Sequence, residues 1–207
     1  MHLTIKEWED SQQHPPDSPK PQAVLGCVGS CIQTATGRMF DPLHPRAEDV
    51  DIRDIAAALS KLCRFTGHVS KFYSVASHCL NASYMVPKAF AAEALLHDAS
   101  EAYLSDLARP IKLYFPEYKT LETAIERVIA ERFNLQYPWP PIIKHIDNVL
   151  LRKEAEELMF PCVNNWHLSL PSGPIPGFDV PIVSEHPEDA EIDFLERWGE
   201  IQKWRKL

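Results

Sequence analysis

The chain has 207 residues, of which 45% are hydrophobic, and a formal net charge of −8 at pH 7. This length and apolar content are enough for one enzyme-sized domain with a sizeable core, so we expect a single domain over residues 1–207. The acidic balance argues against a nucleic-acid polymer as partner, because surfaces that grip one need clustered cations. No apolar run reaches the roughly eighteen residues of a membrane span, so we expect no membrane partner. A small anionic substrate fits this composition, since it needs only local positive charge.

The first part of the chain divides into a lead-in and a short hairpin. Residues 1–23 hold several prolines and show little periodicity, so we expect an exposed or partly ordered lead-in. Residues 23–42 then predict a hairpin-like segment with Thr36 and Gly37 at its turn. We expect this segment to cover one edge of the core.

The rest of the chain is predicted to be helical, so the expected fold class is an all-α bundle. Asp51 is the expected N-cap of the first helix, with Asp54 in its first turn, and Gly67 breaks the pattern that follows. Prolines open the three helices that come next, at Pro87, Pro116 and the pair Pro140-Pro141.

The C-terminal part is predicted to be a loop followed by a helix. Prolines exclude a regular helix between residues 161 and 187, where we expect a long ordered loop. This loop either reaches over a neighbouring chain or the cleft, or it is a plain surface connector. The last segment, 187–207, predicts an amphipathic helix that docks through Phe194, Leu195, Trp198 and Ile201. If Trp198 and Trp204 are exposed, this helix is a candidate interface of a homo-oligomer.

The cysteines indicate a reducing compartment. They are odd in number and contain no CxxC pair, and no apolar signal segment precedes them, so we expect a cytoplasmic protein. They are Cys27, Cys31, Cys63, Cys79 and Cys162.

One short segment carries the first sign of chemistry. His97 and Asp98 are adjacent, and on a helix Glu101 would share a face with His97 and lie beside Asp98. An imidazole and a carboxylate together bind divalent cations. The alternative is a buried core histidine, since His97 follows the apolar run AFAAEALL.

Two further residues strengthen the metal interpretation. His78 lies at the edge of an apolar stripe in residues 72–83, and Asp147 lies at the border of another stripe in residues 140–158. A carboxylate in such a place is costly unless it is paired or bound to a metal. The alternative for Asp147 is a solvated position or a local ion pair with Lys144 or Arg152.

The order of these residues resembles a known signature. His78, the pair His97-Asp98 and Asp147 follow the H…HD…D pattern of the HD-domain metal-dependent phosphohydrolases. The stretch HDASE…DL…PIK is similar to bacterial 5′-deoxynucleotidases and to compact phage-type deoxynucleoside triphosphate hydrolases. An Arg-aromatic pair at 64–65 also falls where that group carries one. The resemblance spans roughly residues 34–160.

The resemblance implies a fold, a cofactor and a base. The fold would be an HD-domain helical bundle in which His78, His97, Asp98 and Asp147 ligate a divalent metal ion. Glu101 would be the catalytic residue that positions or deprotonates the attacking water. A bound metal lowers the pKa of water from about 15.7 to roughly 7. Zinc, cobalt, manganese, magnesium and iron all remain open as the ion.

The same resemblance implies residues that bind substrate. Arg64 would face a phosphate through its planar fork and Lys112 as a point charge, the alternative being solvated surface cations. Asp106 would accept a hydrogen bond from the sugar 3′-hydroxyl, unless it is only a helix N-cap. Phe65 stands where the deoxynucleotidases carry tryptophan, so the aromatic wall beside the 2′ position would be smaller.

Two related activities fit these residues best. A triphosphate hydrolase would release deoxynucleoside and triphosphate, and a 5′-deoxynucleotidase would act on monophosphates. A surplus of cations near the motifs suits the triphosphate. These cations are Arg64, Lys71, Arg109, Lys112 and Lys144. The complete motif disfavours a non-catalytic nucleotide-binding module, and the acidic balance disfavours an HD phosphodiesterase.

Overall fold

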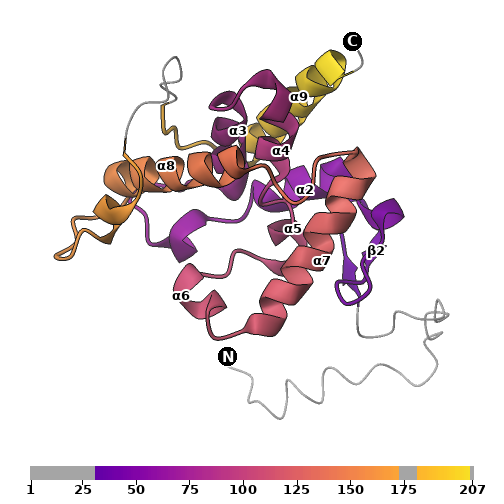
Figure 1. The fold of residues 1–207 in the computed structure, drawn as a ribbon, viewed down its shortest axis with the longest axis horizontal. Helices are drawn as coiled ribbons and strands as arrows, with labels where there is room; N and C mark the ends of the chain where they lie inside the picture. Colours follow the sequence, from indigo (N-terminus) through magenta and orange to yellow (C-terminus); the bar gives the residue numbers. More distant parts are fainter. Residues whose placement is uncertain (1–30, 173–180, 206–207) are drawn as a thin grey trace, which may run out of the picture. The chain divides into compact units, whose positions relative to one another are not determined.

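A short hairpin and a set of packed helices make up the described part of the chain, residues 31–172 and 181–205 of a computed structural model (Figure 1). The elements in chain order are β1 (Ile32–Gln33), β2 (Met39–Phe40), α2 (Ile52–Leu59), α3 (Val75–Tyr84), α4 (Ala91–Leu96), α5 (Glu101–Leu104), α6 (Arg109–Lys112), α7 (Pro116–Phe133), α8 (Pro141–Leu158) and α9 (Pro187–Arg205). The expected helical fold with a hairpin is confirmed. The lead-in expected over 1–23 lies outside the described residues, and the single domain over 1–207 stays a prediction.

The hairpin closes at the predicted turn and covers the helices as expected. β1 and β2 pair antiparallel, and Gly37 adopts a left-handed φ of 81° between them. Asp54 of α2 accepts hydrogen bonds from the backbone N–H of Thr36 at 2.6 Å and from its hydroxyl at 2.9 Å. Phe40 is fully buried and stacks on Tyr103 of α5 with ring centroids 3.9 Å apart. One hydrogen-bonded anchor and one aromatic contact therefore hold the hairpin against α2 and α5.

The core centres on α3, whose residues from Val75 to Ser83 are all buried. Helices α4, α8 and α9 pack around it, and α9 also contacts α2. A helix that is buried on all sides must satisfy its polar side chains inside the protein. This requirement applies directly to His78, which has no exposed surface.

The C-terminal helix docks as predicted, through the fully buried Phe194 and the nearly fully buried Ile201. Trp198 also docks as predicted, and neither Trp198 nor Trp204 is exposed, although exposure was the condition for a candidate interface. Both are half-buried against the core, and Trp198 meets the ring of Phe133 edge-on at 5.0 Å. The homo-oligomer stays a prediction.

Local signals set the helix ends. Asp51 caps α2 by accepting a hydrogen bond from the backbone N–H of Arg53 at 3.0 Å, as predicted. Pro116 and Pro141 occupy the first turns of α7 and α8, where a missing N–H leaves no bond unmade. Gly67 has a φ of 79° and ends the 3-10 turn Arg64–Gly67, which lies between α2 and α3.

The proline-rich segment is a connector in its described parts, 161–172 and 181–186. It contains one 3-10 turn, Trp166–Ser169, and no α-helix in those parts. Arg152 of α8 donates to the carbonyls of Leu168 and Leu170 at its start. The hydroxyl of Ser184 donates to the carbonyl of Phe72 at its end. These bonds tie the segment to α8 and to the residues before α3.

The cysteines differ in part from the expectation of a fully reduced set. Cys31 is disulfide-bonded, whereas Cys63, Cys79 and Cys162 are free thiols. Among the residues that the structure describes, no helix combines the length and the apolar character that crossing a membrane requires.

The cap of α2 gives a prediction about stability. Asp51→Ala removes the acceptor for the backbone N–H of Arg53, so the free energy of unfolding should fall by about 1 kcal/mol. Asp51→Asn keeps an acceptor oxygen and should retain most of the stability. Urea denaturation of the three proteins measures the difference. Equal losses in both variants would show that the ion pair of Asp51 with Arg53, and not the cap, stabilises the helix.

Candidate metal centre

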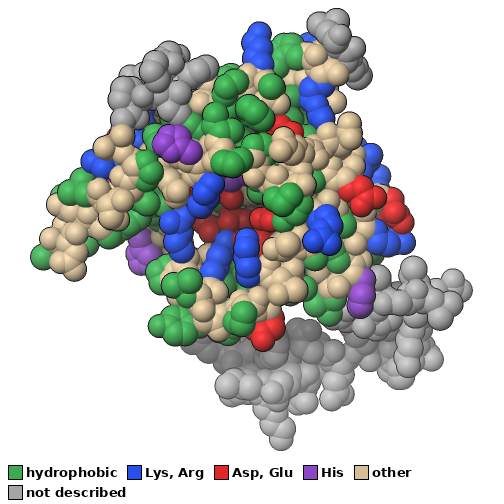
Figure 2. Space-filling model, in the orientation of Figure 1, with side chains coloured by type: hydrophobic (Ala, Val, Ile, Leu, Met, Phe, Trp, Pro, Cys, Tyr) green, Lys and Arg blue, Asp and Glu red, His purple; other side chains and the backbone are tan. Residues whose placement is uncertain are grey.

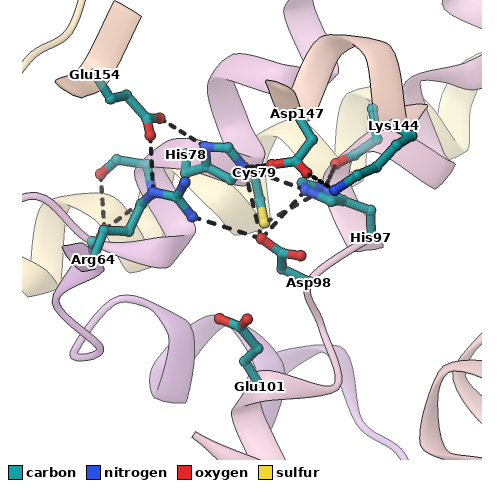
Figure 3. A network of polar contacts seen from close by, with 12 residues as sticks. Arg64, His78, Cys79, His97, Asp98, Glu101, Lys144, Asp147 and Glu154 are labelled. Atoms are coloured by element: carbon teal, nitrogen blue, oxygen red, sulfur yellow. Dashed lines mark hydrogen bonds and ion pairs between the residues drawn. The ribbon is translucent and has the colours of Figure 1, made fainter. Parts of the chain in front are cut away.

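Four side chains from three parts of the fold converge on one point (Figure 3). His78 comes from α3, His97 and Asp98 directly follow α4, and Asp147 comes from α8. The Nε2 atoms of the two histidines are 3.3 Å apart. Nε2 of His78 lies 3.5 Å from Oδ1 of Asp147 and 3.6 Å from Oδ2 of Asp98, and Nε2 of His97 lies 3.3 Å from the same Asp98 oxygen.

These separations suit a single bound cation. Two atoms that are each about 2.1 Å from one ion lie about 3.0 to 3.4 Å apart at octahedral and tetrahedral angles. The ligand atoms of His78, His97 and Asp147 all lie within 4.8 Å of one another. Two imidazoles and two carboxylates are a donor set that zinc, cobalt, manganese and iron accept. The four predicted ligands are therefore brought together in a geometry that fits a divalent metal ion.

Both imidazoles present Nε2 to this point because Nδ1 is occupied elsewhere. Nδ1 of His97 lies 2.8 Å from the carbonyl of Ala94, one turn earlier in α4, and donates its proton there. Nδ1 of His78 lies 2.7 Å from Oε1 of Glu154. Since a carbonyl and a carboxylate only accept, each Nδ1 carries a hydrogen and each Nε2 keeps its lone pair for a metal.

The chain departs from the expected single helix at this site. α4 ends at Leu96, residues 97–100 form a turn, and α5 begins at Glu101. The backbone bonds here span three residues, from Ala99 N–H to Leu96 and from Glu101 N–H to Asp98. The expectation of one helical face from His97 to Glu101 was therefore wrong, because a tighter turn replaces the α-helix there.

Glu101 lies buried beside the metal cluster. In Figure 3 its carboxylate points toward Asp98. Oε1 lies 3.4 Å from Nζ of Lys112, while Oε2 is buried and has no hydrogen-bond partner among the described residues. Burial, with the nearby charges of Asp98 and Asp106, raises the pKa of Glu101 well above its ordinary value. A buried acceptor without a donor is a place where a water molecule can bind.

The carboxylates and imidazoles of the cluster shift one another's pKa values. Burial lowers the pKa of His97, but the charges of Asp98 and Cys79 and the hydrogen bonds to both together raise that pKa well above the ordinary value. Burial raises the pKa of Asp147, but its bond to His78 and the charge of His97 bring it well below the ordinary value. Lys144 holds the other oxygen of Asp147 at 2.7 Å. Asp147 therefore forms the local ion pair with Lys144 that was the alternative prediction, and its second oxygen faces His78.

Arg64 and Phe65 lie next to this centre on an irregular turn. Arg64 is 8% exposed, which rules out a solvated surface cation. Its Nε donates to Oε2 of Glu154 at 2.9 Å, and its Nη1 lies 3.7 Å from Oδ2 of Asp98. Phe65 and Thr66 both have a φ of 55°, a strained conformation for residues other than glycine. Strained residues of this kind cluster at functional sites, where the surrounding contacts hold them in place.

The other predicted substrate residues divide into two groups. Asp106 and Lys112 are half-buried near the centre. Burial raises the pKa of Asp106, and the charges of Arg64, Asp98 and Lys112 also act on it. Asp106 is not an N-cap, because Ala108 holds that position before α6. Arg109 and Lys71 are exposed, and neither forms an ion pair with any described residue.

Two buried acids belong to the site although the sequence did not single them out. Glu154 has no exposed surface and joins His78 to Arg64, and Glu122 of α7 holds Lys112 at 2.9 Å. Glu154 follows Asp147 by seven residues, two turns along one face of α8. That spacing was the one available signal. Glu122 also pairs with Lys119, three residues earlier on α7, but its contact with Lys112 of α6 has no local signal.

One face of the molecule is hollowed and charged. Figure 2 shows Lys and Arg side chains around the rim of a hollow that has acidic side chains at its floor. Lys144, 65% exposed, and Lys112, 23% exposed, both bind acids of the site through Nζ. An anionic ligand entering the hollow would meet cations first and the acidic floor after them.

Comparisons with known proteins give relatives of similar length. The chain is 37% identical over 179 residues to the uncharacterized protein YfdR of Escherichia coli, covering 86% of this chain and 98% of that protein. It is 34% identical over 137 residues to an uncharacterized protein of Rhodobacter capsulatus, covering 59% of this chain and 70% of the relative. No family model matches the chain.

The metal centre gives a prediction about pH. The pKa values of His78 and His97 are both raised, so protons compete with a cation for Nε2. Affinity for Co²⁺ should therefore be weak near the ordinary histidine pKa of about 6.5 and should keep rising as the pH increases above it. Titration calorimetry in buffers of different ionisation enthalpy should also detect released protons.

The exposed His145 on α8 supplies the control for this measurement. His145→Asn should leave the pH dependence of Co²⁺ binding unchanged. An affinity that does not vary with pH in the parent protein would contradict histidine ligation.

Proposed function

The chain belongs to the same family as YfdR of Escherichia coli, and we propose that this member is a metal-dependent phosphohydrolase of deoxynucleoside triphosphates. The products would be a deoxynucleoside and triphosphate. The observation that carries the proposal is that Glu101 lies beside the cluster of four predicted metal ligands with its Oε2 atom buried. This atom has no hydrogen-bond donor among the described residues. The resemblance to HD-domain phosphohydrolases supports the same chemistry.

The proposed reaction assigns separate tasks to the residues. A bound divalent cation would polarise a phosphoryl oxygen and lower the pKa of water. Glu101 accepts a proton as the water oxygen bonds to the α-phosphorus and the bond from phosphorus to the 5′ oxygen breaks. The 5′ oxygen leaves as the hydroxyl of the deoxynucleoside. The raised pKa of Glu101 suits a group that takes up a proton near neutral pH and then returns it.

The cations around the hollow support a triphosphate as substrate. A triphosphate carries several negative charges, and Lys and Arg side chains surround the acidic floor in Figure 2. Arg109 and Lys71 are exposed and unpaired among the described residues, so both remain available for phosphate. In this proposal Asp106 accepts from the 3′-hydroxyl and Phe65 faces the sugar.

One observation favours the second candidate, a 5′-deoxynucleotidase. Arg64 and Lys112 are already bound to Glu154 and to Glu122, so much of their charge is balanced within the protein. A site with less free positive charge suits a monophosphate. The two candidates share the metal centre and Glu101, and differ only in the phosphate chain that is held.

The released product separates the two candidates. The metal-loaded protein is incubated with deoxy- and ribonucleoside mono- and triphosphates, and the released phosphate species are identified by chromatography. Triphosphate released from deoxynucleoside triphosphates supports the proposal, and orthophosphate released from monophosphates supports the second candidate. Absence of hydrolysis of every nucleotide with Mn²⁺, Co²⁺, Zn²⁺ and Mg²⁺ would refute both.

Substitution of Glu101 gives a prediction about rate. Glu101→Gln removes the proton acceptor but replaces no predicted metal ligand, so hydrolysis should slow by roughly 10²- to 10⁴-fold with metal content unchanged. Single-turnover rates and elemental analysis measure the two effects separately. Glu131→Gln, an exposed position on α7, is the matched control. If Glu101→Gln loses its metal and regains the parent rate when metal is resupplied, Glu101 is a ligand and not the base.

A further inference from the structure

Glu154 occupies an unusual place for an acid, because its side chain is completely buried between three elements. Oε1 lies 2.7 Å from Nδ1 of His78 on α3, and Oε2 lies 2.9 Å from Nε of Arg64 on the turn before α3. The two oxygens of one carboxylate therefore face a predicted metal ligand and a predicted phosphate ligand (Figure 3).

Both neighbours require an acceptor. The Nε of Arg64 always carries a hydrogen, and Nδ1 of His78 must carry one if Nε2 is to keep its lone pair for a metal. A carboxylate accepts at both oxygens and satisfies both donors. An amide accepts at its oxygen only, and its NH₂ group would point at one of the two N–H groups. The pair of contacts thus selects a carboxylate at position 154.

We infer that Glu154 is a positioning residue of the centre, which holds His78 in the tautomer that binds metal and aims the guanidinium of Arg64 at the phosphate. The part about Arg64 rests on the proposed function, and the part about His78 does not. Glu154 would contact neither the metal nor the substrate. It acts through the two side chains that do.

The geometry around Arg64 supports this role. With Nε held by Glu154, the two Nη groups lie at the far end of the planar fork, and Nη1 is 3.7 Å from Oδ2 of Asp98. Donors that are fixed before a phosphate arrives need no rearrangement when it binds. Carboxylates that hold the second nitrogen of a metal-binding histidine act in the same way on the metal.

The test is Glu154→Gln, with Glu156→Gln as its control. Glu156 is on the same helix but is half-exposed and pairs with Arg152. Calorimetry measures the dissociation constant of Co²⁺ for each protein, and that of inorganic triphosphate for each Co²⁺-loaded protein. Circular dichroism and the unfolding midpoint establish that the variants are folded.

Glu154→Gln should raise at least one of the two dissociation constants by about 10- to 100-fold, the usual loss when such a partner is removed. Loss of Co²⁺ affinity supports the part of the inference about His78, and loss of triphosphate affinity supports the part about Arg64. The inference is overturned if both constants stay within about twofold of the parent.

A measurement on the unsubstituted protein covers the case in which Glu154→Gln does not fold. Long-range ¹H–¹⁵N correlation spectra of the Zn²⁺-loaded protein identify which nitrogen of His78 carries hydrogen. A hydrogen on Nδ1 and a metal-bound Nε2 agree with the inference. Metal on Nδ1 would overturn it.

These readouts separate this inference from the proposed function, since none of them needs nucleotide turnover. A protein that hydrolyses no nucleotide but binds Co²⁺ in a Glu154-dependent way refutes the function alone. A protein that hydrolyses deoxynucleoside triphosphates, but binds Co²⁺ and triphosphate equally well with glutamine at 154, refutes the inference alone.

Discussion

The cost of burying ionised side chains shapes this structure more than any other constraint. An isolated charge inside a helical bundle is strongly unfavourable unless an opposite charge or a metal ion balances it. His78 and Glu154 have no exposed side-chain surface, and the Arg64 side chain has 9%. Each of these side chains is balanced by another, because Glu154 contacts Arg64 through one oxygen and His78 through the other. This series of contacts ends at the Nε2 atoms and carboxylates of the metal centre, which are held in place before any ligand binds.

The paired cations limit what the centre can do. Lys112 contacts both Glu101 and Glu122, so it stabilises the charged form of the proposed base. Lys144 binds Asp147 and so partly offsets the charge of a metal ligand. These cations therefore balance acids of the protein and also offer charge to a substrate. The positive charge that is left for the substrate decides between a monophosphate and a triphosphate.

Much of the fold and the ligand set followed from the sequence, because their signals are local. Apolar periodicity and prolines located α7, α8 and α9, and the acid at 51 and the glycine at 37 placed a cap and a turn. The order of the histidines and aspartates identified side chains that converge in space. The resemblance, and not periodicity alone, brought Asp147 into this set.

What the sequence did not predict depends on contacts between distant elements. The contacts of Glu154 with His78 and of Glu122 with Lys112 join different helices, and no local pattern marks these pairs. The break between α4 and α5 arises where His97 bonds back to Ala94 and the chain tightens into a turn. The helix pattern predicted that Trp198 docks, but it does not say which neighbour covers the ring. The ring of Phe133 covers it.

The central claim is that one divalent ion binds where the four side chains converge. Anomalous diffraction from crystals soaked in Mn²⁺ or Zn²⁺ tests it most directly. The account predicts a single strong peak about 2.0 to 2.3 Å from Nε2 of His78, Nε2 of His97 and a carboxylate oxygen of Asp98 and of Asp147. A peak bonded to Sγ of Cys79 or to Nδ1 of His78, or no peak at this point, would contradict it.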